Sequence, residues 1–200
     1  GAISKVFGGS TPPVTSITGS PALLATTAVA SFTFTADEPG STFECRLDGG
    51  VWGLCPANYS GLAEGSHTFE VHATDQAGNT GAAASRTFTI DTTAPAAPTI
   101  TGGPPSPGND TTRTFSFTGE TGATFECRVD TAAFAACTSP RTLATLADGP
   151  HTFDVRATDP AGNVDASPAS RPFTVDTVPP QTSISSGPSG LSNDPTPTFA

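Results

Sequence analysis

The sequence is poor in the residues that long helices and membrane spans need. It contains no methionine and one lysine, and 35% of its residues are hydrophobic. No stretch approaches the roughly 18 consecutive apolar residues of a membrane-spanning helix. Glycine and proline are plentiful instead, with 21 and 20 copies, which is typical of short strands joined by many turns. Threonine, serine, phenylalanine and valine favour pleated sheets. We therefore expect an all-β chain.

Basic residues are also scarce, and this excludes one class of partner. Eight lysine and arginine residues stand against 18 acidic ones, which gives a formal net charge of −10. Affinity for nucleic acids depends on lysine and arginine side chains that neutralise phosphates. The sequence therefore predicts no nucleic-acid partner, and we interpret the acidic surplus as a source of solubility and of repulsion between neighbouring copies.

Motifs of known catalytic chemistry are missing as well. The sequence has no glycine-rich phosphate loop, no zinc-protease helix and no nucleophile elbow. His67 and His151 occur in the same frame of two matching segments, whereas a catalytic histidine needs a nucleophile and an orienting acid within hydrogen-bond reach. We interpret both histidines as turn or capping residues, and we expect neither enzymatic activity nor a cofactor.

The main feature that is present is an internal repeat. Residues 42–48, Thr-Phe-Glu-Cys-Arg-Leu-Asp, recur with one conservative change at 124–130, and residues 65–75 recur at 149–159. The offset between copies drifts from roughly 82 to 85 residues, because loops tolerate changes in length and strands do not. The chain is therefore expected to contain tandem copies of one small module.

A third copy begins near the end of the sequence, where Gly187-Pro188 and Thr198-Phe199 match segments of the second copy. Since a strand and a half cannot bury its apolar face, we expect either that the natural chain is longer or that this stub pairs with another element. We divide the chain into an N-terminal segment that would act as an anchor, two domains and the start of a truncated third repeat: residues 1–10, 11–92, 93–177 and 178–200.

Within one copy the apolar residues alternate with a period of two. Phe69, Val71 and Ala73 point to one side of a strand, and the polar residues between them point to the other, which is typical of antiparallel sheets with one wet face. Turn residues divide each copy into about seven strands, which is the spacing of a β-sandwich. Proline-rich segments after residues 92 and 177 are expected to be short, semi-rigid linkers.

The four cysteines form two pairs, Cys45 with Cys55 and Cys127 with Cys137, each ten residues apart around a hairpin signal. With a loop at residues 49–51, Cys45 would lie directly opposite Cys55. We predict one intra-sheet disulfide per domain, with free buried thiols as the alternative. The spacing does not fit a metal site. Persistent disulfides indicate an oxidising compartment.

These residues resemble the bacterial Ig-like repeat family. The resemblance is carried by Phe-Glu-Cys-Arg-Leu-Asp-Gly-Gly at 43–50, by the segment at 65–75 and by Ala-Gly-Asn at 77–79, and it covers about residues 11 to 200. It implies tandem sandwiches of a kind that occurs in secreted and surface proteins and is appended to phage virion proteins. It implies no ligand and no catalytic residues.

The segments Asp75–Asn79 and Asp159–Asn163 have two interpretations. A calcium site at a domain junction is one, because calcium prefers several oxygen ligands and another aspartate lies nearby at the end of each copy. The alternative is a hairpin turn in which the aspartate caps and Gly-Asn supplies positive φ. We favour the turn, since each copy offers few carboxylates. The candidate calcium ligands are Asp75, Asp91, Asp159 and Asp176.

Three aromatic residues are candidates for a binding patch. Trp52 and its counterpart Phe134 lie just after the hairpin tip, and Tyr59 follows. Such side chains stack on glycans or anchor proteins. The alternative, which we favour, is that Trp52 and Phe134 pack over the disulfides.

Three functions fit these patterns. The first is a non-enzymatic structural or adhesive segment of an extracellular or cell-surface bacterial fibre or stalk, suggested by near-identical units with proline-rich joints. The second is a phage virion accessory protein, a head decoration or tail component, suggested by Ile3, Val6 and Phe7 among the glycines of residues 1–10. The third is a carbohydrate-binding module. The expected partners are subunits of a fibre or virion, contacted through residues 1–10, or glycans; no membrane insertion is expected.

Overall fold

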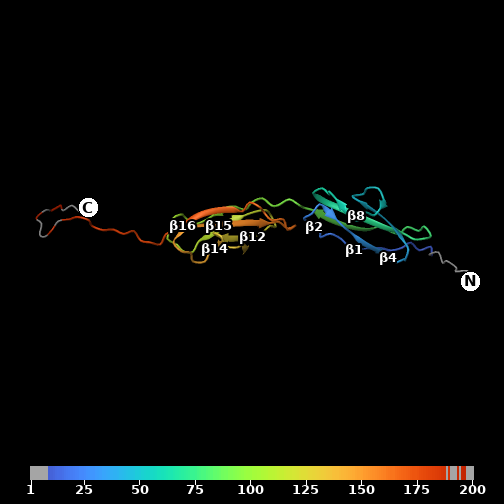
Figure 1. Ribbon diagram of the computed structural model, residues 1–200, viewed down its shortest axis with the longest axis horizontal. Coiled ribbons are helices and arrows are strands. Elements are labelled where there is room, and N and C mark those ends of the chain that lie inside the picture. Colours follow the sequence, from blue (N-terminus) through green and yellow to red (C-terminus); the bar gives the residue numbers. More distant parts are fainter. Residues whose placement is uncertain (1–8, 188, 190–192, 194, 197–200) are drawn as a thin grey trace, which may run out of the picture.

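The computed structural model describes residues 9–187, 189, 193, 195 and 196, and it contains two β-sandwiches that follow one another along the long axis (Figure 1). Strands, turns and irregular segments make up these residues, and none of them is helical. Within the described part of the chain there is no helix long and apolar enough to cross a membrane.

The first sandwich is built from nine short strands. One layer has the order β2-β9-β8-β5-β6, and the other consists of the pairs β1–β4 and β3–β7. The strands are β1 (Thr15–Gly19), β2 (Leu24–Ala25), β3 (Val29–Ala30), β4 (Thr33–Ala36), β5 (Thr42–Leu47), β6 (Gly53–Leu54), β7 (Tyr59–Ser60), β8 (Gly65–Thr74) and β9 (Ala84–Ile90).

The second sandwich repeats this plan with seven strands. Its layers have the orders β13-β12-β15-β16 and β10-β11-β14. The strands are β10 (Thr99–Gly102), β11 (Thr114–Thr118), β12 (Thr124–Val129), β13 (Ala135–Cys137), β14 (Arg141–Thr142), β15 (Gly149–Thr158) and β16 (Ala169–Val175). The predicted fold class, tandem Ig-like sandwiches in an all-β chain, is confirmed. Of residues 178–200, the described ones form no strand, and Thr198-Phe199 and residues 1–8 lie outside the described part.

The core of the first sandwich lies along β8, the longest strand of its layer. Phe69, Val71 and Ala73 are at most 1% exposed and face the second layer, from which Phe32 stacks on Phe69 with ring centroids 3.9 Å apart. Strand β8 is paired on both sides, with β5 and β9. Burying a phenylalanine contributes about 2–3 kcal/mol, so this row holds the two layers together.

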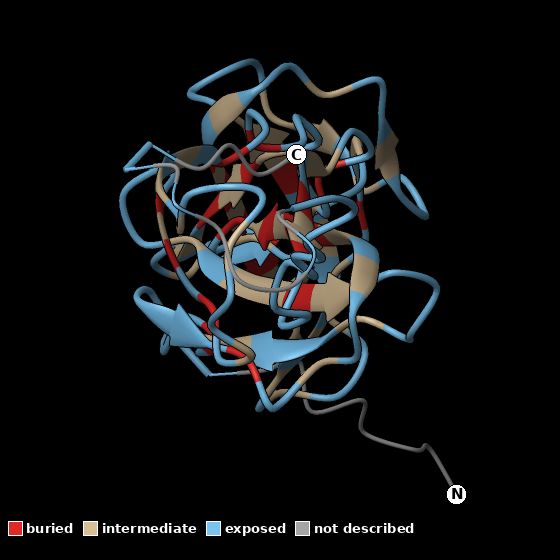
Figure 2. Ribbon diagram, turned by 90° about the vertical axis from the view of Figure 1, so that its left-hand side faces the viewer, coloured by how far each residue is buried: buried red, intermediate tan, exposed pale blue. Residues whose placement is uncertain are grey.

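The second sandwich has the same core in the same places. Phe153, Val155 and Ala157 on β15 are fully buried, and Phe115 stacks on Phe153 at 4.4 Å. In the view along the long axis, the buried segments lie in the middle and are surrounded by exposed loops (Figure 2). The period-two alternation therefore predicts the core faces of both central strands correctly.

Each sandwich carries one disulfide between the predicted partners. Cys45 is bonded to Cys55 with a Cα–Cα distance of 4.9 Å, and Cys127 to Cys137 with 5.8 Å. Cys45 and Cys127 are buried in the two cores. Both bridges join adjacent strands or their direct continuation, and thus staple a hairpin inside one layer.

The expected register of these hairpins is wrong. Cys45 pairs with Gly53 rather than with Cys55, and Cys127 pairs with Ala135, so each disulfide is diagonal. The cause is a tighter turn than a loop at 49–51. Asp48 has φ 53°, a left-handed conformation that aspartate tolerates better than most residues, and the Gly50 amide donates to the Leu47 carbonyl at 3.0 Å.

The second sandwich buries an arginine where the first has an alanine. Arg113 is 1% exposed, and its guanidinium donates to the carbonyls of Pro105, Gly108 and Thr174. Ala30 holds the matching position, and there β2 pairs in parallel with the end of β9. In the second sandwich only a single parallel bridge joins Gly108 to β16. Arg113 therefore fastens the 105–108 loop to β16 in place of a strand.

Arg113→Met is expected to destabilise the second sandwich alone, by on the order of 3 kcal/mol, because it removes the charged hydrogen-bond donors that tie the 105–108 loop to β16. Circular dichroism would report the loss, whereas fluorescence of Trp52, the one tryptophan, would show an unchanged first sandwich. Arg141→Met on the exposed strand β14 is the control. An unchanged melting curve for Arg113→Met would contradict the role assigned to this residue.

Candidate functional site

A histidine links the start of each central strand to the hairpin turn. His67 Nδ1 lies 2.7 Å from Asp48 Oδ2, and His67 Nε2 lies 2.9 Å from the Ala63 carbonyl oxygen. The other Asp48 oxygen accepts from the Thr68 amide at 2.8 Å. Asp48 is thus held by the strand that its turn faces, which is the local reason for its left-handed backbone.

The second sandwich repeats this link at matching residues. His151 Nδ1 lies 2.8 Å from Asp130 Oδ2 and Nε2 lies 3.0 Å from the Ala147 carbonyl oxygen, and the Thr152 amide donates to Asp130 at 2.8 Å. Asp130 also has a left-handed backbone, with φ 54°. Both histidines lie in the central strands, and their rings reach the aspartates of the hairpin turns, which agrees with the turn or capping role that the sequence predicts.

Both nitrogens of each ring face an acceptor, an arrangement that an imidazolium satisfies fully because both nitrogens then donate. The pKa of His67 is raised by the bond to the Ala63 carbonyl and then by the Asp48 carboxylate. The pKa of His151 is raised by Asp130 and then by Ala147. Each histidine–aspartate pair can thus act as an ion pair that joins a hairpin turn to a central strand, here called a histidine clasp.

The segments Asp75–Asn79 and Asp159–Asn163, here called the Asp–Asn loops, are turns tied by their own aspartate. Asp75 Oδ1 accepts from the Ala77 and Asn79 amides at 2.8 Å, and Oδ2 accepts from the Asn79 side chain at 2.7 Å. These bonds lower the pKa of Asp75, the Asn79 side chain contributing most. Both carboxylate oxygens are therefore engaged within the loop.

The aspartates grouped as candidate calcium ligands do not meet within a sandwich. Asp75 follows the last residue of β8, whereas Asp91 follows Ile90, which pairs with Gly65 at the other end of β8. A ten-residue strand separates its ends by about 30 Å. Asp75 and Asp91 therefore lie at opposite poles of one sandwich, and by the same topology so do Asp159 and Asp176. Asp91 lies instead near the loop of Asp159, across the junction, where the Asn163 side chain donates to its carbonyl. The described residues hold no cluster of three or more potential metal ligands.

The aromatic candidates also lie apart. Tyr59 packs in the core, its ring 5.9 Å from that of Phe69. Trp52 lies on the outer side of its layer, where the Arg46 guanidinium sits 4.4 Å from its ring centroid and the His72 ring packs edge-on at 4.1 Å. Because Tyr59 and Trp52 are on different sides, a common patch is not formed.

Trp52 and Phe134 pack against arginine side chains. The sequence analysis had favoured packing over the disulfides instead. Phe134 has Arg128 and Arg156 at 4.4 and 4.3 Å. In the first sandwich Arg46 is in turn held by both oxygens of Glu70 at 2.7 and 2.9 Å. The reason is the strand's alternation: Cys45 faces inward, so its neighbour Arg46 faces outward and meets Trp52. These cation–π contacts attach the hairpin to the sheet surface.

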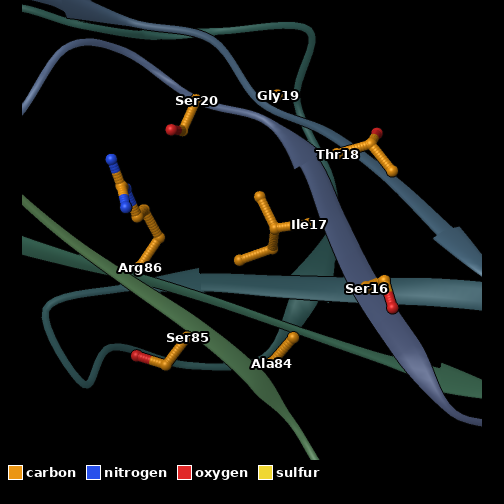
Figure 3. A pocket seen from close by; sticks show the side chains of 8 residues that line it. All are labelled: Ser16, Ile17, Thr18, Gly19, Ser20, Ala84, Ser85 and Arg86. Carbon is orange, nitrogen blue, oxygen red and sulfur yellow. The ribbon is translucent and has the colours of Figure 1, made fainter.

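A hollow of about 630 Å³ lies between β1 and β9 of the first sandwich, with Ile17 and Ala84 at its base and Ser20 across from Arg86 (Figure 3). Arg86 Nε is buried and has no hydrogen-bond partner. The sequence analysis missed this hollow, because it forms between β1 and β9, which belong to different layers and are far apart in the sequence. Its remaining lining residues are Ser16, Thr18, Gly19 and Ser85.

With both sandwiches described, the comparison of sequence families decides the identity. Residues 15–92 and 96–177 each match the bacterial Ig-like domain family. The chain belongs to this family. The resemblance drawn from the repeated cysteine, histidine and Asp–Asn segments is thereby confirmed. Bacterial Ig-like domains are typically structural and non-catalytic modules, and this chain is a tandem repeat of them.

Solved structures share the architecture at low identity. The fibronectin(III)-like modules of CbhA from Clostridium thermocellum are 17% identical, over 81% of this chain and 94% of theirs, with a TM-score of 0.49. A tetra-tandem repeat from the extending region of a large adhesion protein is 21% identical, over 83% and 49%, with 0.33. The FN1–FN3 domains of chicken CNTN1 are 11% identical, over 88% and 70%, with 0.31.

At these identities the likeness concerns the fold alone, and at these TM-scores it carries no argument about function. No curated protein matches the chain by sequence. The role of these bacterial Ig-like domains must therefore be argued from their own geometry.

The histidine clasps predict a pH-dependent stability. A histidine with a raised pKa in the folded state stabilises fully below its ordinary pKa of about 6.5, and this stability is lost as the pH rises through the folded pKa. Urea unfolding followed by Trp52 fluorescence should show a first sandwich that is more stable at pH 6 than at pH 8.5. His67→Gln should flatten this slope.

His151→Gln removes the same clasp from the second sandwich and is the matched control. It should leave unchanged the pH dependence of the stability of the first sandwich, which Trp52 fluorescence reports. A His67→Gln variant with the pH slope of the unmodified chain would contradict a charged clasp.

Proposed function

We propose that this chain is a non-enzymatic spacer, a segment of a stalk or fibre that extends from a bacterial cell or its secreted assemblies. The observation that carries the proposal is the path of the chain through each sandwich. It begins at one pole and leaves at the other, so that each added repeat lengthens the array (Figure 1).

The contacts at the two poles support this path. At the first pole, the Asn79 side chain donates to the Gly9 carbonyl at 3.0 Å, and a side chain at Gly81 would collide with the Pro13 carbonyl. At the opposite pole, β9 ends at Ile90 beside Gly65. The segment before β1 is therefore held at one end of β8, and the segment after β9 leaves at the other.

The disulfides support a location outside the cytoplasm. Each sandwich is small, and a bridge that closes a loop of ten residues adds roughly 2–3 kcal/mol in the chain-entropy model. Such bridges persist in oxidising compartments and are rare in the reducing cytosol. A spacer exposed to the medium would gain stability from this staple.

The outer surfaces support a passive rather than a catalytic role. Arg46, Glu70 and Trp52 on the first sandwich, and Arg128, Asp154 and Phe134 on the second, satisfy one another in compact groups. Surface pairs of this kind contribute little energy individually, but they keep charged groups engaged with the sheet. We assign these groups to maintaining the hairpins.

Antibodies raised against the two repeats should label intact producing bacteria, because a stalk segment is exposed to the medium. Immunofluorescence before and after permeabilisation is the measurement, with a cytoplasmic protein of the same cells as the control. Labelling that appears only after permeabilisation would contradict the proposal. Labelling of purified phage particles instead of cells would replace it with the virion role.

A further inference from the structure

The two sandwiches are joined by a hydrogen bond between a loop of the second and the end of the first. The side-chain amide of Asn163 donates to the main-chain carbonyl of Asp91 at 2.8 Å, across 72 positions of sequence. Asp91 directly follows β9, and Asn163 ends the Asp–Asn loop after β15. The bond therefore crosses the joint between the repeats.

The donor is held in a fixed orientation by its own loop. Asp159 Oδ2 accepts from the Asn163 side chain at 2.8 Å, and Oδ1 accepts from the Asn163 and Gly162 amides at 2.8 and 2.7 Å. The Asp159 amide donates back to the Asn163 carbonyl at 3.0 Å. Because a side-chain amide has two hydrogens, one serves Asp159 and the other is directed at Asp91.

The acceptor is held as firmly. The Asp91 amide donates to the Ala25 carbonyl at 2.9 Å, and the Thr92 amide and hydroxyl both donate to the Glu64 carboxylate. The Asp91 carboxylate accepts from the Thr93 amide at 3.3 Å. The exit segment, residues 91–93, is thus fixed to the first sandwich before it meets the second.

The same donor and acceptor arrangement recurs at the start of the first sandwich. Asn79 donates one hydrogen to Asp75 at 2.7 Å and the other to the Gly9 carbonyl at 3.0 Å, and Gly9 precedes the first sandwich at the position where Asp91 precedes the second. In both repeats the asparagine side chain donates to two acceptors, one in its own loop and one in the segment before the repeat. This recurrence argues against a chance contact.

The exit of the second sandwich is built like that of the first. The Thr177 amide and hydroxyl donate to Asp148 at 3.0 and 2.9 Å, and the Asp176 amide donates to the Gly108 carbonyl at 3.0 Å. Asp176 therefore presents its carbonyl from the same kind of fixed segment as Asp91.

We propose that the Asp–Asn loop is a docking element that clamps each repeat onto the exit segment of the preceding one. Its partner is another Ig-like repeat, and the carbonyl of Asp176 is the docking site for the Asp–Asn loop of a further repeat. The clamp sets the relative orientation of neighbouring repeats and makes the array stiff. The inference goes beyond the spacer role, because the clamp would act wherever the array is located.

The clamp depends on one side chain, because Asn163 makes the hydrogen bond that links the two sandwiches. A Cβ atom added at Gly162 would lie 4.0 Å from Cγ2 of Thr26 of the first sandwich, so the loop lies close to its neighbour beside the bond. One hydrogen bond shifts an equilibrium by about tenfold. Its removal is therefore sufficient to free the joint while leaving both sandwiches folded.

Residual dipolar couplings of the full chain test the clamp, because they report the relative orientation of the two sandwiches. In the unmodified chain both should share one alignment tensor. Asn163→Ala should abolish the common tensor, so that each sandwich aligns independently. Asn79→Ala is the matched control: it removes the same bonds within its loop but spares the joint, and it should keep the common tensor.

Independent alignment in the unmodified chain would overturn the proposal, as would a common tensor that survives Asn163→Ala. Loss of the common tensor in Asn79→Ala would overturn it too, because that loop does not lie at the joint. Thermal melting of both variants should show equal shifts, each in its own sandwich. If Asn163→Ala does not fold, Asn163→Ser, whose short side chain cannot serve both acceptors, replaces it with the same expected outcomes.

Discussion

Each repeat depends on the packing of the inward-facing side chains of its central strand against the opposite layer. Phe69, Val71 and Ala73 on β8 are buried between the layers, and their strand is hydrogen-bonded on both sides. The aromatic stack of Phe32 on Phe69 closes the space between the layers. Since loss of such a side chain costs about 3–5 kcal/mol and a small domain has about 5–15 kcal/mol in total, a repeat without this row would not fold.

The same strand connects the other features of the repeat. His67 lies near its start and ties the hairpin turn through Asp48, whereas Asp75 follows its end and forms the Asp–Asn loop. One long strand thus carries the clasp at one pole, the core in the middle and the docking loop at the other pole. Because neighbouring repeats meet pole to pole, the rigidity of this strand extends from one repeat to the next.

Much of this organisation was predictable from the sequence, because it depends on local patterns. The alternation at 65–75 predicts β8, and the spacing of Cys45 and Cys55 around a hairpin signal predicts their disulfide. The register was missed, because it depends on Asp48 adopting a left-handed backbone. That conformation is stabilised by the Thr68 amide and by His67, which come from another strand.

The features that sequence patterns did not reveal depend on contacts between distant segments. Arg113 looks like an ordinary surface cation in the sequence, and only its mismatch with Ala30 in the other copy gave a signal. Tyr59 was grouped with Trp52 because the two are close in sequence, although they lie on different sides of a layer. The bond from Asn163 to Asp91 involves a main-chain carbonyl, which has no sequence signature; the recurrence of Ala-Gly-Asn was the one available clue.

Amide hydrogen exchange measured by NMR tests the central claim most directly. If the β8 row and its copy on β15 hold the repeats together, the slowest-exchanging amides of each sandwich will lie on these strands and their paired neighbours, and they will open only with global unfolding. Amides of Phe69–Ala73 or Phe153–Ala157 that exchange as fast as those of the loops would contradict the account.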